Sequence, residues 1–326
     1  MSTKPITAEV ALVPNYLFHL PAVARAGYDS DYADRYAATV NDDDRRFITD
    51  HRELFRFGAG QGGPMCNFAL FMPIMLDLDC RGAVDELLRL VIDTLRTGET
   101  EPLFQRYHRR CQHLRDTWFA PDPEQIIACR RELPVVERYA DIVYHNWNRY
   151  QSEVWPLECR LIQVVATQIN AHFVGCDTVG EWERLTGREF RTPGCKIILC
   201  SALKNGPNAN SMGYDRIVFW SGQELNWTLD FISHEIGTHL MIDVVRTLQA
   251  DATVDWQEMY AAYESLCRYL NARVLGREPL YDLKQFHAAA YASLYEKLIP
   301  DPLMCDYPRA VKEAVAWRKR TNEKPS

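Results

Sequence analysis

The 326-residue sequence has no long hydrophobic run. Its longest apolar stretch, Phe68–Leu76, is interrupted by Pro73 and followed by Asp77 and Asp79. A membrane-spanning helix needs ~18–20 apolar residues, so we expect no membrane partner. The first 21 residues have no apolar segment flanked by small residues, and we therefore expect no signal peptide.

The sequence also has no excess of positive charge. Its 37 lysine and arginine residues are outnumbered by 44 aspartate and glutamate residues, which gives a net charge of −7. Nucleic-acid binding draws its affinity mainly from cations that neutralise phosphates. The charge balance therefore predicts that nucleic acid is not a partner.

Ten cysteines are present, but no Cys-x-x-Cys pair and no regular spacing occurs among them. Disulfide frameworks are typical of exported chains, for which this sequence shows no leader. We interpret the cysteines as reduced thiols, mostly in the core, and expect a cytoplasmic protein. A Gly-x-Ser-x-Gly nucleophile elbow is absent, and the glycine cluster at 58–63 lacks the Lys-Ser/Thr of a phosphate loop.

The composition is that of a folded globular protein, with 47% hydrophobic and 25% charged residues. Residues 1–27 read as extended and irregular, whereas the rest of the first half reads as helical. Short β-branched or aromatic segments predict strands at Lys196–Leu199 and Arg216–Trp220, separated by a loop at 205–211. The expected helices are Ser30–Phe57, Val84–Thr97, Glu101–Thr117, Pro123–Leu133, Val135–Tyr150, Leu157–Phe173, Leu229–Leu248, Val254–Leu275, Tyr281–Ile299 and Arg309–Arg320.

These elements predict an α-rich α+β fold. A helical region at 1–150, of unknown role, would precede a catalytic region at 151–326. In that second region a small sheet would pack on the helices that carry the site.

The chemistry is indicated by His234-Glu235-Ile236-Gly237-Thr238-His239 on an apolar helix. In zinc hydrolases two histidines of one helix bind the metal, and the adjacent glutamate activates its water. The usual spacing is His-Glu-x-x-His, one residue shorter than here. The alternative interpretation is that the two histidines lie on opposite sides of a core helix, each satisfied by a hydrogen bond.

The extra residue has a geometric consequence. An α-helix turns 100° per residue, so histidines five residues apart are offset by ~140°, against ~40° for the usual spacing. A π-type turn would bring the two imidazoles together again, and Gly237 would make such a bulge sterically easier. We therefore expect a local distortion in this helix.

A catalytic zinc takes three protein ligands and leaves a fourth position for water. Glu258 is the first choice for the third ligand, because it follows His239 by 19 residues among apolar neighbours. Glu264 is the second choice and Asp255 the third. Glu235 is the expected catalytic base.

Other residues are weaker candidates. His287, Tyr291 and Tyr295 recur at helical spacing, and His287 and Tyr291 are candidates for stabilising the oxyanion. Asp243 could orient His239 through a hydrogen bond. Arg216–Trp220 is a candidate edge strand that could pair with a peptide substrate.

The motif at 234–239, together with Trp256-Gln257-Glu258-Met259-Tyr260-Ala261, resembles the microtubule-associated tyrosine carboxypeptidases. It is also similar to their bacterial relatives, the flavohemoglobin-expression-modulating proteins with a Gln-Glu-Gly-Leu-Ala motif. The second segment matches that motif at Gln257, Glu258 and Ala261, and the resemblance covers about residues 190–265. It implies a gluzincin-like catalytic core with Zn²⁺ on His234, His239 and Glu258.

Motif and resemblance together predict a zinc metallopeptidase of carboxypeptidase type. Its substrate would be a peptide or a protein C-terminus, hydrolysed by a zinc-activated water. Two alternatives remain open: a zinc enzyme that acts on a non-peptide small molecule of a biosynthetic pathway, and a binding protein with a degenerate metal site.

Overall fold

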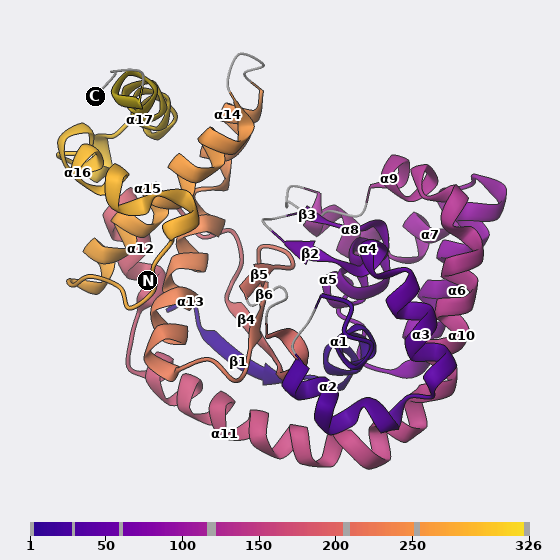
Figure 1. Ribbon diagram of the computed structural model, residues 1–326. Coiled ribbons are helices and arrows are strands. Elements are labelled where there is room, and N and C mark those ends of the chain that lie inside the picture. Colours follow the sequence, from indigo (N-terminus) through magenta and orange to yellow (C-terminus); the bar gives the residue numbers. More distant parts are fainter. Residues whose placement is uncertain are drawn as a thin grey trace. The chain divides into compact units, whose positions relative to one another are not determined.

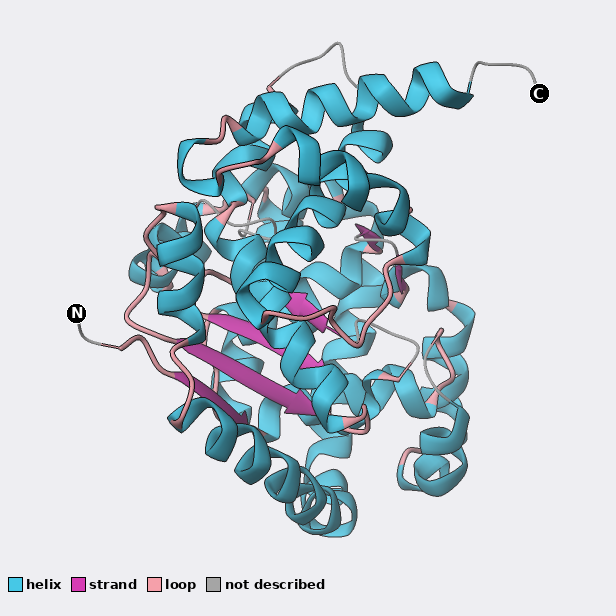
Figure 2. Ribbon diagram, turned by 90° about the vertical axis from the view of Figure 1, so that its left-hand side faces the viewer, coloured by secondary structure: helices cyan, strands magenta, loops and turns pink. Residues whose placement is uncertain are grey.

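The computed structural model describes residues 3–27, 30–58, 61–115, 122–204, 209–250 and 255–322. Helices dominate, and the strands form a four-stranded mixed sheet and a separate short hairpin (Figures 1 and 2). The predicted α-rich α+β class is thus confirmed. Within the described ranges, no helix has the length and apolar character needed to cross a membrane. All ten cysteines are free, as expected for reduced thiols.

Contacts divide the chain into two compact units. We call residues 6–170 and 195–222 the sheet unit, and residues 1–5, 171–194 and 223–326 the helical unit. The predicted boundary at residue 150 does not coincide with these units, because each unit is assembled from separate stretches of the chain. The four-stranded sheet belongs to the first unit and the residues of the motif to the second.

The sheet in the first unit has the order β1-β4-β6-β5. Strand β1 (Ile6–Val10) pairs in parallel with β4 (Cys195–Cys200), and β4 pairs in parallel with β6 (Arg216–Trp220). Strand β5 (Ala209–Ser211) runs antiparallel to β6. The prediction that Arg216–Trp220 is an edge strand is therefore wrong. The short polar strand β5 carries no alternating pattern that would have distinguished it from a loop.

The other elements of the sheet unit are mostly helices. They are α1 (Leu12–Val23), α2 (Ser30–Tyr36), α3 (Asp42–Asp50), α4 (Arg52–Phe55), the β2–β3 hairpin (Phe57–Gly58 and Gln61–Gly62), a π-helix (Cys66–Phe71), α5 (Met72–Met75), α6 (Arg81–Thr97), α7 (Glu101–Arg106), α8 (His108–Leu114), α9 (Pro123–Ala128), α10 (Leu133–Arg149), a second π-helix (Tyr150–Val154) and α11 (Trp155–Val174), whose last residues belong to the helical unit. Short 3₁₀ turns lie at Ala37–Thr39, Arg130–Glu132 and Ser201–Leu203.

The prediction of an extended and irregular segment at 1–27 is wrong for α1, which is helical, whereas β1 is extended. Every residue of α1 from Val13 to Val23 is buried, so tertiary packing outweighs the unfavourable Pro21, whereas Pro14 lies in the first turn, where proline is tolerated. Asn15 fixes the helix to the end of β4. Its amide nitrogen donates to the Leu199 carbonyl at 2.9 Å, and its oxygen accepts from the Ser201 N–H at 3.1 Å.

The predicted single helices Ser30–Phe57, Glu101–Thr117 and Leu229–Leu248 are each divided into shorter helices. Val135–Tyr150 corresponds to α10, and α12 (Thr178–Thr186) was not foreseen. Predictions that fall on Thr117, Val254 and residues 205–208 lie outside the described residues.

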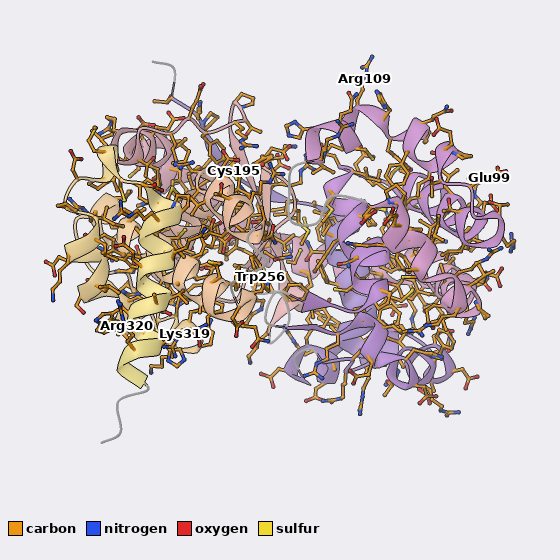
Figure 3. The ribbon with its side chains drawn as sticks, turned by 90° about the horizontal axis from the view of Figure 1, so that it is seen from above. Glu99, Arg109, Cys195, Trp256, Lys319 and Arg320 are labelled. Atoms are coloured by element: carbon orange, nitrogen blue, oxygen red, sulfur yellow. The ribbon has the colours of Figure 1, made fainter. Side chains whose placement is uncertain are left out.

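In the helical unit, α15 (Trp256–Leu275) is the central element. It contacts α12, α13 (Leu225–Leu240), α14 (Ile242–Gln249), α16 (Ala288–Leu298) and α17 (Tyr307–Asn322). Asp255 caps its first turn by accepting from the Gln257 N–H, and Gly276 ends it in a left-handed conformation. Two 3₁₀ turns, Lys284–Phe286 and Pro302–Met304, precede α16 and α17. The exposed Lys319 and Arg320 lie in the last turns of α17, and Trp256 lies at the start of α15 (Figure 3).

His19 in α1 predicts a pH dependence of stability. Its side chain is fully buried, with Nδ1 3.0 Å from the Tyr32 hydroxyl and Nε2 3.1 Å from the Thr39 hydroxyl. Burial lowers the pKa of His19 to about 3, whereas an unfolded histidine titrates near pH ~6.5. Below pH ~6.5 the unfolded chain thus binds a proton that the folded chain excludes.

We expect His19 to contribute stability that is fully present above pH ~6.5 and is lost as the pH falls toward 3, with a slope of up to ~1.4 kcal/mol per pH unit. Urea unfolding of the wild type and of His19→Gln between pH 7 and 4 measures this slope. The glutamine variant should be less stable at pH 7 but should lose less stability on acidification. Equal slopes for the two proteins would contradict the prediction.

Candidate functional site

The candidate site is built where α13 faces α15. Glu224 caps α13 by accepting from the N–H groups of Asn226 and Trp227 at 3.0 and 2.7 Å. In the middle of α13, His234 Nε2 lies 3.0 Å from Glu264 Oε2 of α15. The histidine is 0% exposed and the glutamate 8% exposed. The structure thus pairs one histidine of the motif with the second-choice carboxylate.

Aromatic rings surround His234. Its ring centroid lies 5.1 Å from that of Phe231 and 5.2 Å from that of Tyr281, and Trp227 stacks on Phe231 at 4.7 Å. Against these rings, Nδ1 of His234 is buried without a hydrogen-bond partner. An unsatisfied buried nitrogen costs roughly 1–3 kcal/mol. His234 is therefore not explained as a core histidine whose two ring nitrogens are both hydrogen-bonded.

Glu235 lies beside this pair and is partly exposed. Its carboxylate accepts from the Thr238 hydroxyl at 3.3 Å. Burial, together with the nearby carboxylates of Glu264 and Glu235, raises the pKa of Tyr260 well above its usual value. Glu264 and Glu235 both act on the Tyr260 hydroxyl, so these three side chains share one neighbourhood.

The expected π-type turn is absent from α13, which is a regular α-helix from Leu225 to Leu240. The two histidines consequently keep the offset of ~140° that a regular helix imposes on residues five apart. His239 stacks on Phe190, with ring centroids 6.3 Å apart, whereas His234 faces α15.

Gly237 has another role than the one predicted from the sequence. A Cβ at this position would lie 2.3 Å from the indole ring of Trp182 in α12. The glycine thus allows α12 to approach α13. Trp182 is 0% exposed and donates its indole N–H to the Ser233 hydroxyl at 3.2 Å.

Glu258, the first choice for the third ligand, has a different neighbourhood. Its Oε2 lies 3.5 Å from Nη1 of Arg318 in α17, and the same nitrogen lies 3.5 Å from the Tyr291 hydroxyl. Glu258 and Glu264 are six residues apart, which places them ~120° apart around α15. The structure thus assigns Glu264 to the His234 side and Glu258 to the α17 side. As a metal ligand, Glu258 stays a prediction.

The weaker candidates are also spread over several elements. His287 precedes α16 in a left-handed conformation, with φ 54°, so it does not continue the helical face of Tyr291 and Tyr295. Both tyrosines are fully buried, and the Tyr295 hydroxyl donates to the Ala262 carbonyl at 2.7 Å. Asp243 in α14 pairs with Arg191.

A metal ion fits this site in part. Ligands of a tetrahedral zinc, each ~2.0–2.2 Å from the metal, lie ~3.3 Å from one another. The 3.0 Å between His234 Nε2 and Glu264 Oε2 is close to that separation. Among the described residues, however, no group of three or more histidine, cysteine, aspartate or glutamate side chains is close enough together to hold a metal. The structure thus brings together two side chains of types that bind zinc, and among the described residues it places no third one beside them.

From the sequence, Glu264 was only the second choice for the third metal ligand, and neither Tyr281 nor Arg268 was singled out. One signal for Glu264 was present. Glu264-Ser265-Leu266 keeps the glutamate and leucine of a Glu-Gly-Leu segment at their spacing, with serine for glycine. Tyr281 was predicted to begin a helix, Tyr281–Ile299, but α16 begins only at Ala288, and Tyr281 lies in the segment between α15 and the 3₁₀ turn at Lys284–Phe286.

Comparison of the chain with protein-family models, with curated proteins and with solved structures finds no match in any of the three. The resemblance described above is therefore neither supported nor contradicted by them.

The contact between Gly237 and Trp182 predicts the effect of one added methyl group. Gly237→Ala should destabilise the protein by ~1–3 kcal/mol, because the indole must move out of a filled space. Urea unfolding measures this loss. Gly82→Ala in α6 is the matched control, since a Cβ there meets nothing within 4 Å. Equal stabilities of the two variants would contradict this account of Gly237.

Proposed function

We propose that the protein is a zinc-dependent hydrolase, a metallopeptidase of carboxypeptidase type that removes residues from a peptide or protein C-terminus. The observation that carries the proposal is the 3.0 Å pair of His234 Nε2 and Glu264 Oε2, with Glu235 next in sequence and partly exposed. An imidazole and a carboxylate are residue types that ligate zinc, and a glutamate adjacent to the histidine is the base that such enzymes use, which supports the proposal.

In this proposal His234 and Glu264 hold the metal, and His239 is the third ligand. Zinc held there would lower the pKa of a water and polarise the scissile carbonyl. Glu235 would be the base, accepting a proton from the attacking water and passing it to the leaving amine.

The proposal requires a rearrangement of His239. Its ring stacks on Phe190, on another side of α13 from Glu264. His239 lies in the last turn of α13, just before the break at Met241. A π-type turn there would reduce the offset between the two imidazoles, since such a turn closes over one more residue.

A binding protein with a degenerate metal site is the second candidate function. The specific observation in its favour is that, among the described residues, three metal-binding side chains do not come together. His234 and Glu264 would then form a buried hydrogen bond without catalytic use. The two experiments below separate this candidate from the hydrolase.

The first experiment measures metal content. Wild-type protein dialysed against zinc and then buffer should retain one zinc per chain by mass spectrometry. His234→Ala and Glu264→Ala should each lose it, since each removes a ligand. Glu258→Ala, whose carboxylate faces Arg318, is the matched control and should retain it. Loss of zinc in Glu258→Ala but not in Glu264→Ala would reverse the assignment, and no zinc in the wild type would support the degenerate site.

The second experiment tests the base. Glu235→Gln should keep its zinc and lose ~10²–10⁴-fold in the rate of hydrolysis, because glutamine cannot accept the proton. Release of free amino acids from a pool of N-acetylated pentapeptides, followed by mass spectrometry, measures that rate. Glu313→Gln, at a carboxylate of α17 paired with Arg309, is the matched control and should hydrolyse like the wild type. Unchanged release by Glu235→Gln would exclude the assigned role.

A further inference from the structure

Arg268 occupies an unusual position on α15. It follows Glu264 by four residues, so the two side chains leave the same face of the helix, with their Cβ atoms ~5–6 Å apart. Its guanidinium carbon lies 6.0 Å from the centre of the Tyr281 ring, which packs against His234. The guanidinium is therefore directed along the aromatic wall of the candidate site.

The hydrogen bonds of Arg268 are incomplete. Its Nη2 lies 3.2 Å from the carboxylate of Glu278, whose side chain is 79% exposed, while the side chain of Arg268 is 15% exposed. Nε of Arg268 is buried and has no acceptor. Among the described residues of the helical unit, Nε of Arg268 and Nδ1 of His234 are the two buried side-chain polar atoms without a partner.

The other arginines near this site are satisfied differently. Arg277 makes two hydrogen bonds to the buried Asp230 carboxylate, at 2.6 and 2.7 Å. Arg273, an exposed residue of α15, donates to the Tyr269 hydroxyl at 3.1 Å. In contrast to Arg273 and Arg277, Arg268 has a buried Nε without an acceptor, so its Nε–Nη edge lacks a full partner. That edge presents two parallel N–H groups, the arrangement that binds a carboxylate in a bidentate manner.

We propose that Arg268 binds the terminal carboxylate of the substrate and so makes the enzyme a carboxypeptidase rather than an endopeptidase. This inference rests on the proposed function. The terminal carboxylate lies one residue, ~3.8 Å between Cα atoms, beyond the scissile carbonyl. A carbonyl at the His234–Glu264 pair therefore brings the carboxylate toward the next turn of α15, where Arg268 lies.

Glu278 is the competitor in this arrangement. In the free protein it holds one end of the guanidinium from an exposed position, where an ion pair contributes little. A substrate carboxylate that reaches both Nε and Nη2 replaces a weak single contact with a bidentate one. Glu278 thus keeps the guanidinium oriented without blocking it.

The test uses binding, so that it does not depend on turnover. Immobilised full-length protein, freed of metal with a chelator, is offered a pool of random N-acetylated pentapeptides as free acids together with the same pool as C-terminal amides. Mass spectrometry gives the ratio of retained acids to retained amides. The wild type should prefer acids, and the ratio of retained acids to retained amides should fall at least about tenfold in Arg268→Met. Arg268→Lys should retain part of it, because an ammonium cannot bind in a bidentate manner.

Two further variants sharpen the test. Arg273→Met, which removes an exposed charge from the same helix, should keep the full preference. Glu278→Gln should increase it about threefold, because the competing carboxylate is gone. Circular dichroism and zinc content of every variant show that fold and metal site are intact.

An equal retention of acids and amides by the wild type, or an unchanged preference in Arg268→Met, would overturn the inference. That failure is distinguishable from failure of the proposed function, which shows as absent zinc binding and absent hydrolysis in the wild type. Hydrolysis that releases internal fragments rather than terminal residues would uphold the zinc hydrolase and reject the role of Arg268.

Discussion

The hydrogen bonds of Asn271 hold α13 in register with α15, and the candidate site depends on that register. Asn271 is 0% exposed; its oxygen accepts from the Ser233 hydroxyl at 2.6 Å, and its nitrogen donates to the Asp230 carbonyl and the Tyr281 hydroxyl, both at 3.0 Å. A slip of one residue along either helix would rotate its side chains by 100° and break this set. Because the set is buried, each broken bond would leave a costly unsatisfied group. His234, next to Ser233, is thereby held opposite Glu264.

The same network fixes the loop that completes the site. Asn271 binds the Tyr281 hydroxyl, and Asp230 accepts from Arg277 and from the Leu280 N–H at 2.8 Å. The segment after α15 is thus bound to the first half of α13, and its Tyr281 ring is laid against both His234 and Arg268. The aromatic wall is therefore a consequence of polar contacts beneath it.

Much of the helical architecture could be predicted from the sequence, and the site only in part. Apolar periodicity located α6, α10, α13 and α15, and β-branched runs located β4 and β6. Periodicity gives no information on which helix meets which. The choice between Glu258 and Glu264 depended on the rotation of α15 relative to α13, which buried groups such as Asn271 determine. The apolar neighbours of Glu258, which favoured it in the sequence, pack elsewhere, and its carboxylate meets Arg318.

Other differences between the sequence predictions and the structure also arise from tertiary contacts. The segment before residue 27 looked irregular because α1 is apolar on all sides and contains two prolines, yet parallel pairing of β1 and burial of α1 determine its structure. The π-type turn was expected in α13, but π-helices occur instead at Cys66–Phe71 and Tyr150–Val154. Packing of Trp182 against Gly237 opposes a bulge in this helix, and the rearrangement proposed for His239 has to overcome that packing.

Stability alone gives no reason for the polar groups at this site. A buried pair such as His234 and Glu264 can often be replaced by apolar residues of similar volume with no loss of stability. Here the imidazole also carries an unsatisfied nitrogen, and one turn beyond Glu264 the guanidinium of Arg268 carries another. Both incomplete groups lie against Tyr281, whereas the polar groups deeper between α13 and α15, those of Ser233 and Asn271, are paired with each other. The hydrogen bonds between the two helices are thus complete, whereas those next to the Tyr281 ring are not. This is the arrangement expected where a bound ligand supplies the missing hydrogen-bond partners.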